Sequence, residues 1–91
     1  MFKIREGVGN APSSFSITFE NGWTVSLAMG GNTYSTGNSK DGFVAAEVAV
    51  IDPDGLFVDQ GSGSGVEGWV SLEGVLRTIN KISLIPAKET V

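Results

Sequence analysis

The sequence predicts a small α+β domain, a mostly antiparallel sheet of two β-hairpins with one C-terminal helix packed on it. Three observations lead to this prediction. Polar and apolar residues alternate on both sides of Asn21-Gly22, a long apolar run ends at the turn sequence Asp52-Pro53-Asp54-Gly55, and a helical apolar stripe follows Ser71. Such a helix must bury its stripe against the apolar face of the sheet. An all-β, barrel-like fold is the alternative.

The length of the chain bounds its organisation. Its 91 residues form one domain, because domains usually contain about 50–250 residues. We expect residues 1–86 to be the compact domain and residues 87–91 to be a loose tail.

The register of the first hairpin follows from its alternation. A two-residue Asn-Gly turn would place the apolar residues of the two strands on opposite faces, because directly opposed residues share a face. A three-residue loop, Glu20-Asn21-Gly22, with Gly22 in the left-handed region, instead pairs Phe19 with Trp23. All the apolar residues of both strands then lie on one buried face: Phe15, Ile17, Phe19, Trp23, Val25 and Leu27.

A second hairpin is predicted further along the chain. Residues 42–51 are apolar on both faces, which favours a central strand. The turn at residues 52–55 has Pro, Asp and Gly where β-turns prefer them. We expect residues 56–60 to return as a shorter strand. Residues 61–65 contain only Gly and Ser and are typical of a flexible surface loop.

The C-terminal part of the chain predicts one helix, residues 72–81, with Ser71 as its N-cap. Gly74 inside this helix costs about 1 kcal/mol relative to alanine. We expect a last strand at Ile82, Leu84 and Ile85, and a first, edge strand at Phe2 and Ile4. The apolar stripe of the helix has helical spacing: Leu72, Val75, Leu76 and Ile79.

The composition excludes several kinds of chemistry. The chain has no histidine and no cysteine, so imidazole catalysis, thiol chemistry, disulfides and Cys/His zinc sites are impossible within it. Its 10 acidic and 6 basic residues give a net charge of −4, whereas general nucleic-acid binding needs a basic surface. We therefore expect no enzymatic activity, no metal, no cofactor and no general nucleic-acid binding.

The apolar segments of the chain are short. No run approaches the length of a signal peptide or the roughly 20 residues of a membrane span. We expect a soluble, intracellular protein without membrane association.

Two segments with glycine and asparagine form the candidate binding region. Residues 7–12 precede the hairpin and residues 29–34 follow it, and the predicted register puts both at one end of the sheet. Glycine lets backbone N–H groups approach a ligand, and asparagine both donates and accepts. The candidate ligand-binding residues are Arg5, Asn10, Asn32 and Tyr34, with Arg5 supplying charge and Tyr34 a ring for stacking. The alternative is that both segments are ordinary loops.

The segment from Gly7 to Leu27 also carries a resemblance. The run Gly-x-Gly-Asn-Ala-Pro-Ser, followed by the alternating strand and Asn21-Gly22-Trp23, resembles small uncharacterised accessory proteins encoded by tailed bacteriophages. In that group a Gly-x-Gly-Asn-Tyr element follows the hairpin, and residues 30–34 depart from it in spacing. The resemblance implies a phage accessory protein that acts in the cytoplasm of the bacterial host.

Two classes of function follow from these observations. The first is a non-enzymatic accessory protein that binds a host protein and inhibits a component of host defence. The second is a module that binds or sequesters a small, nucleotide-like ligand; a minor structural component of the virion is a third. Convergence of cations on Asn10 and Asn32 would favour the ligand, and dispersal of the cations would favour the protein partner.

Self-association is expected as well. One helix covers only one face of a sheet, and residues 42–51 are apolar on both faces. An apolar face left uncovered on so small a protein favours association. We therefore predict a homodimer or a larger homo-oligomer.

Overall fold

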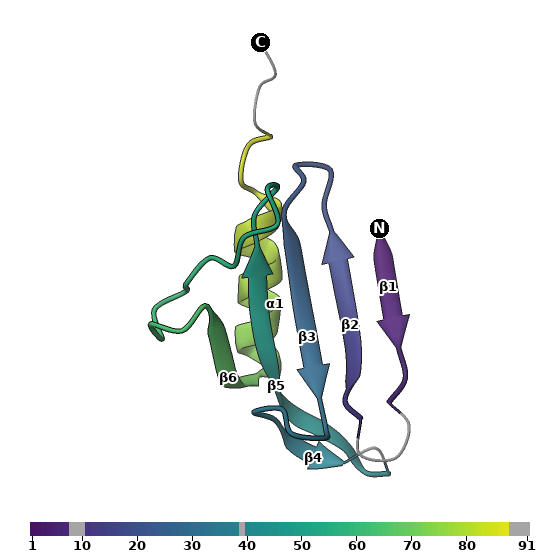
Figure 1. Ribbon diagram of the computed structural model, residues 1–91. Coiled ribbons are helices and arrows are strands. Elements are labelled where there is room, and N and C mark those ends of the chain that lie inside the picture. The colour runs from purple at the N-terminus through teal and green to yellow at the C-terminus, as the bar shows by residue number, and fades with distance from the viewer. Residues whose placement is uncertain (8–10, 39, 88–91) are drawn as a thin grey trace.

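A computed structural model describes residues 1–7, 11–38 and 40–87 of the chain, which form an antiparallel sheet with one helix packed on it (Figure 1). The predicted α+β class is confirmed, and the sheet is not closed into a barrel. Of the predicted tail, residues 88–91 lie outside the described residues. The elements are β1 (Phe2–Arg5), β2 (Ser13–Thr18), β3 (Thr24–Met29), β4 (Thr36–Asn38), β5 (Gly42–Ile51), β6 (Val66–Ser71) and α1 (Leu72–Ser83).

β5 is the central strand, as its two apolar faces predict. Val48 pairs with Leu27 of β3 and with Glu67 of β6, so these two strands occupy opposite edges of β5. Ala45 pairs with both β4 and β6, which places β4 on the same edge as β3. β2 and then β1 extend the sheet beyond β3. β4 lies in a segment without a predicted strand.

The first hairpin has the predicted three-residue loop. Ile17 lies opposite Val25, and Phe19 N–H donates to the carbonyl oxygen of Trp23 at 2.9 Å. Gly22 has φ +88°, a conformation that a residue with a Cβ resists. The register is therefore confirmed, and the apolar side chains of both strands share one face.

The second hairpin differs from the prediction. Residues 56–60 form no strand; the chain there makes only an isolated bridge between Ile51 and Phe57. Val58 still packs against the core, but the chain after it is polar and glycine-rich up to Val66. Because these residues have no apolar side chains to bury, the pairing stops, and β6 takes the free edge of β5.

α1 begins where the sequence predicts. The Ser71 side chain accepts a hydrogen bond from Gly74 N at 3.2 Å, which satisfies one of the free N–H groups of the first turn. Packing explains why a glycine occupies position 74 inside the helix. A Cβ on Gly74 would lie 2.8 Å from Cγ1 of Val70, so the glycine lets the helix lie close to β6.

α1 ends two residues later than predicted, at Ser83, and the expected last strand at Ile82, Leu84 and Ile85 is wrong. Ile82 follows Val75 by seven residues, so both project from one face of the helix, and both are buried. Burial of Ile82 in the core favours the helical over the extended conformation here.

The Asn21 side chain holds the C-terminal end of the helix. Its Nδ2 donates to the carbonyl oxygens of Ile82 at 2.9 Å and Ile85 at 2.8 Å, and its Oδ1 accepts from Trp23 N at 3.0 Å. The last carbonyl groups of a helix lack partners within the helix. One amide in the hairpin loop therefore satisfies such carbonyls while it shapes its own turn.

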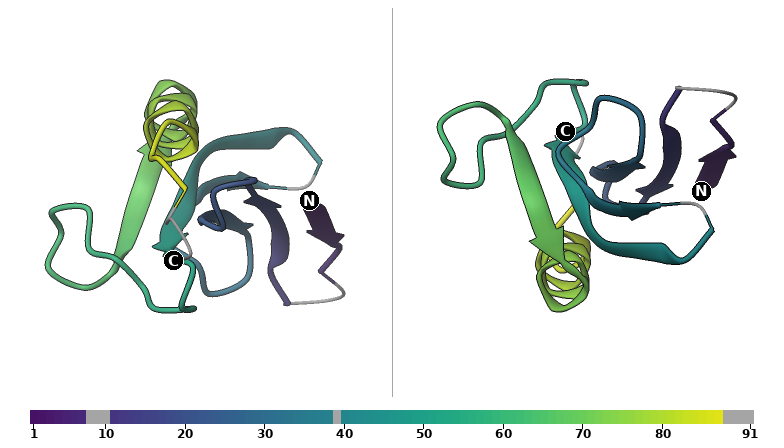
Figure 2. Two further views of the ribbon diagram at one scale, coloured as in Figure 1. Left: turned by 90° about the horizontal axis from the view of Figure 1, so that it is seen from above. Right: turned by 90° about the horizontal axis from the view of Figure 1, so that it is seen from below.

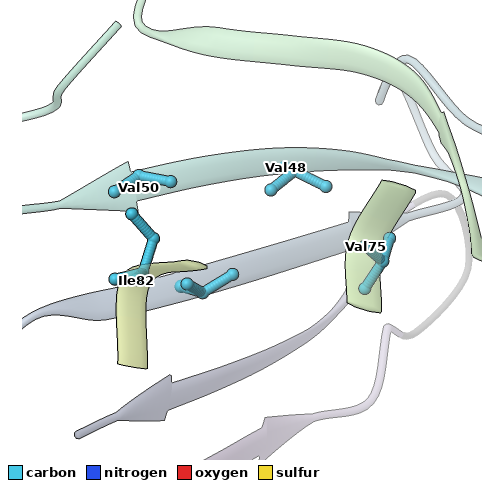
Figure 3. Close-up of a cluster of buried hydrophobic side chains, with 5 residues drawn as sticks. Val48, Val50, Val75 and Ile82 are labelled. Atoms are coloured by element: carbon cyan, nitrogen blue, oxygen red, sulfur yellow. The ribbon is translucent and has the colours of Figure 1, made fainter. Parts of the chain in front are cut away.

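The core lies between the helix and the middle of the sheet (Figure 3). Its fully buried members come from β3, β5 and α1: Val25, Val48, Val50, Val75 and Ile82. The predicted helix stripe is only partly buried, because Leu72 and Leu76 are 63% and 56% exposed.

These two leucines lie on the side of the helix opposite Gly74. Each is two residues from Gly74, about 200° around a helix of 3.6 residues per turn, and Gly74 is the position that approaches Val70. Leu72 accordingly lines a shallow hollow with Leu27 and other apolar residues of the sheet. Leu72 therefore borders a hollow over β3, β5 and β6, and Leu76 is exposed.

The apolar face of the sheet loses its cover toward β1. The register aligns Val50, Val25, Ile17 and Phe2 across four strands, and exposure in this row rises from 0% at Val50 and 1% at Val25 to 69% at Phe2. The helix packs on β5, β3 and β6, to one side of β1 and β2 (Figure 2). We call the apolar residues of β1 and β2 on this face the sheet patch: Phe2, Ile4, Phe15 and Ile17.

The Asn21 contact predicts a specific loss of stability. Asn21→Ala removes the donor to two carbonyl groups, and the free energy of unfolding should fall by about 1–3 kcal/mol. Asn21→Asp should lower the free energy of unfolding further than Asn21→Ala does, because the carboxylate would face the same two carbonyl oxygens. Urea unfolding measures both, with the exposed Asn32→Ala as a control that should change little. Equal stability of the Asn21→Asp variant and the natural chain would contradict the role of this amide.

The sheet patch predicts self-association at micromolar concentration. Ile4, 75% exposed, lies at its edge. Ile4→Glu should convert the homo-oligomer to a monomer, because burying an unpaired carboxylate opposes association. Lys3→Gln changes the net charge by the same amount on the opposite face of β1 and should leave the oligomer intact. Sedimentation velocity measures this, and a monomer of 9.5 kDa for the natural chain would contradict it.

Candidate functional site

The two glycine-containing segments meet at one end of the sheet, as the register predicts. Ser13 at the start of β2 lies opposite Met29 at the end of β3. Between the segments is an open hollow of about 330 Å³. Its lining residues are Gly7, Ala11, Ser13, Met29, Gly30, Gly31, Thr33, Ser35, Gly37, Asn38 and Phe43.

The three candidate ligand residues that the structure describes are not gathered in this hollow. Asn10 lies outside the described residues. Asn32 is exposed and is not among the lining residues, and Arg5 lies on β1 at the edge of a different hollow. Tyr34 contacts Trp69 of β6. The structure therefore brings together the glycine backbones of the two segments rather than these side chains.

The polar groups of the β3–β4 segment are largely used within the segment itself. Gly30 N–H donates to Oγ of Ser35 at 2.9 Å, and the Gly30 carbonyl accepts from Thr33 N at 3.1 Å and Thr33 Oγ1 at 2.6 Å. Groups bonded in this way are not available to a ligand without breaking the turn. The geometry favours a structural role for Gly30.

The same segment crosses β5 and reaches β6. Tyr34 N–H donates to Oε2 of Glu47, a residue of β5, at 3.0 Å. The Tyr34 carbonyl accepts from Trp69 N–H at 2.8 Å. Glu47 lies between Ala46 and Val48, which are buried against the core, so its side chain projects from the opposite face of the strand. The crossing segment therefore lies on the face away from the helix.

β6 is bulged at the point of contact. Ala46 pairs with Val70 and Val48 with Glu67, so the two residues between them in β6 face only one residue of β5. In this bulge Trp69 has φ +49°, the only positive φ at a non-glycine residue in the described parts of the chain. Gly68 is also required, because a Cβ there would lie 2.8 Å from Cβ of Tyr34.

Tyr34 and Trp69 form an exposed aromatic pair. Their ring centroids are 4.9 Å apart and their planes are inclined by 40°. The two side chains are 55% and 62% exposed. Tyr34 is among the residues predicted from the sequence, and Trp69 is not. The dipeptide Gly68-Trp69 between Val66 and Val70 is the feature that could have indicated it, since glycine inside a strand often marks a bulge.

A second polar surface lies on the face of β1 and β2 opposite the sheet patch. Lys3 pairs with Ser16 and Arg5 with Ser14, so cations and hydroxyl groups alternate with the apolar residues of the patch. These four residues, with Ile4 and Ser26, line an open hollow of about 420 Å³. Two cations beside three hydroxyl groups could contact a small anion.

The remaining described cations lie elsewhere. Lys40 is exposed near the turn before β5, and Arg77 is exposed on α1. Lys81 donates to the side-chain oxygen of Gln60 at 3.5 Å. The cations are thus dispersed over the surface. In the described parts of the chain, no three acidic side chains are grouped as a metal site would require, and no helix has the length and apolarity to cross a membrane.

The Gly/Ser loop before β6 is organised by one carboxylate. Oδ1 of Asp59 accepts the N–H groups of Gly61 at 3.0 Å and Gly63 at 2.9 Å. These backbone hydrogen bonds hold the pKa of Asp59 below its usual value of 3.8. The segment expected to be a flexible loop therefore has an internal hydrogen-bond network.

We compared the chain with models of protein families, with curated proteins and with solved structures, and none of them matched. The function of the chain is therefore inferred from its own residues.

The Asp59 network predicts a pH-dependent loop. Its folded pKa lies below the unfolded value, so its stabilisation of the loop is present above about pH 4 and is lost as the pH falls through the folded pKa. Carbon-detected NMR titration of the Asp59 carboxyl group should give a pKa below 3.8. The Gly61 and Gly63 amide signals should move in the same transition. The Asp59→Asn variant should show no such transition. Titration of Asp59 at its ordinary pKa would contradict the hydrogen-bond network.

Proposed function

We propose that this protein acts by binding another protein, without catalysis, and that the aromatic pair of Tyr34 and Trp69 is the contact surface. The observation that supports this most directly is the exposure of two aromatic rings in contact, one of which belongs to a strained, hydrogen-bonded bulge. Tyrosine and tryptophan are the residues that most often carry the binding energy of protein interfaces.

The energetics of the bulge support a functional role. A non-glycine residue in the left-handed region costs on the order of 1–3 kcal/mol and persists where its surroundings enforce it. Here the Tyr34 carbonyl holds Trp69 N–H in place, and Gly68 makes room for the Tyr34 side chain. The exposed tryptophan contributes little to the core, so its placement is better explained by a partner than by stability.

The distribution of charge also favours a protein partner over a small ligand. The cations of the described residues are dispersed over β1, the turn before β5 and α1. The resemblance to small proteins of tailed bacteriophages implies that the protein acts inside a bacterial host. We propose a phage accessory protein in the host cytoplasm that inhibits a component of host defence by binding it.

A second candidate function, binding of a small nucleotide-like anion, is favoured by the hollow that Lys3 and Arg5 line with three serines. Native mass spectrometry of the purified protein distinguishes it from the first. A bound small molecule that is lost in Arg5→Gln, but kept in Arg77→Gln, would favour this alternative.

The proposed function predicts that Trp69→Asn abolishes partner binding and leaves the fold intact. Asparagine adopts the left-handed region readily, so the bulge and its hydrogen bond are retained. The tagged chain and the variant are expressed in the bacterial host, and co-purified proteins are quantified by mass spectrometry. The amount of co-purified partner should fall by at least about tenfold, because a hot-spot residue contributes about 2 kcal/mol or more and each 1.4 kcal/mol is about tenfold in affinity.

The matched control is Leu84→Asn, which removes another exposed apolar side chain, 72% exposed, at the C-terminal end of α1. This variant should retain the partner. Circular dichroism and thermal unfolding show that both variants fold. A folded Trp69→Asn variant that keeps its partner would overturn the proposed surface.

A further inference from the structure

We propose that Tyr34, Trp69 and Glu47 form a recognition site for a guanidinium group, so that the protein partner is bound through an arginine side chain. This inference rests on the proposed function, because it names the chemistry that the aromatic pair recognises. It combines three observations: two exposed rings, a carboxylate hydrogen-bonded to the backbone of one of these residues, and the acidic charge of the whole chain.

Glu47 places a negative charge at the base of the aromatic pair. Its Oε2 accepts the Tyr34 backbone N–H at 3.0 Å, in a hydrogen bond at the surface. A carboxylate has two oxygens with about four acceptor positions in total. The bond to Tyr34 fixes the carboxylate and leaves acceptor capacity for a donor from a partner.

The aromatic rings provide the second part of the site. A guanidinium group is attracted to the face of an aromatic ring within about 6 Å of its centre, and tryptophan gives the strongest attraction. The rings of Tyr34 and Trp69 lie 4.9 Å apart at an inclination of 40°, so they contact each other and a planar cation can stack on an outer, exposed ring face. Arginine fits better than lysine, because its flat group stacks on a ring while its N–H groups bond a carboxylate.

The backbone holds these groups at one place. Tyr34 is bonded to Glu47 through its N–H group and to Trp69 through its carbonyl group. The three residues come from the β3–β4 segment, β5 and β6, so their arrangement does not depend on one mobile loop. Preorganised side chains lose less conformational entropy on binding than free ones do.

The net charge of the chain supports a cationic partner. At −4 it attracts a positively charged surface over the screening length of about 8 Å at physiological salt. An uncharged apolar partner would gain no electrostatic attraction from Glu47. The structure therefore favours a basic protein surface with one arginine placed at the aromatic pair.

The test uses N-acetyl-arginine methylamide as the probe and N-acetyl-citrulline methylamide as its neutral isostere. The indole N–H signal of Trp69, assigned by its loss in Trp69→Asn, is followed by NMR during each titration. The arginine probe should shift this signal saturably with a dissociation constant in the millimolar range. The citrulline probe should bind at least about fivefold more weakly, since it lacks the charge-assisted hydrogen bond.

Two glutamate variants separate the local carboxylate from the general charge. Glu47→Gln keeps an oxygen that can accept the Tyr34 N–H bond and should weaken the arginine probe by about fivefold or more. Glu73→Gln removes the same charge from an exposed position in the first turn of α1 and should have little effect. Equal weakening by both variants would overturn the site, because it would show attraction to net charge alone.

The remaining outcomes distinguish this inference from the proposed function. If both probes bind equally, or neither binds, the guanidinium site is wrong. A co-purified partner that is nevertheless lost in Trp69→Asn leaves the proposed function standing. If the arginine probe binds as expected but Trp69→Asn keeps the partner, the site is real and the proposed function fails.

Discussion

The hydrogen bonds of the Asn21 side chain are the contact on which the arrangement of sheet and helix depends. This residue lies in the β2–β3 loop, and its amide reaches the carbonyl groups of Ile82 and Ile85 at the other end of the sequence. The same side chain accepts a bond from Trp23 N, so the shape of the loop and the position of the helix end are coupled. The position of Ile82 over the core follows from this coupling.

The position of the helix in turn decides which apolar surface is buried. Close approach at Gly74 brings the helix next to β6 and leaves Leu72 and Leu76 on its other flank. The middle of the sheet is covered, whereas Phe2 and Ile4 at its edge are not. The sheet patch offers an apolar surface for association with another molecule. This surface and the aromatic pair lie on opposite faces of the sheet.

β6 carries Trp69, the only non-glycine residue with a positive φ in the described parts of the chain, and hydrogen bonding supports this conformation. The segment between β3 and β4 crosses β5, because Tyr34 is hydrogen-bonded to Glu47 of β5 and to Trp69 of β6. The crossing places Tyr34 against the β6 bulge and turns Trp69 toward solvent. The core and the proposed binding surface are thus separate, and changes at Trp69 can alter binding without removing a core contact.

Local patterns in the sequence determined the hairpin register, the helix start at Ser71 and the central position of β5. The register follows from period-two alternation, the helix start from a capping residue, and the central position of the strand from apolar residues on both of its faces. Each is a pattern among residues that are close in the sequence. The helix end, β6 and the pairing of Tyr34 with Trp69 could not be read in this way. They depend on contacts between residues far apart in the chain: Asn21 with Ile82, Val48 with Glu67, and Tyr34 with Gly68. Two of the four candidate ligand residues, Arg5 and Tyr34, lie apart for the same reason, Arg5 on β1 and Tyr34 over β5 and β6. Their positions follow from which strands share β5, and only the tertiary structure decides that.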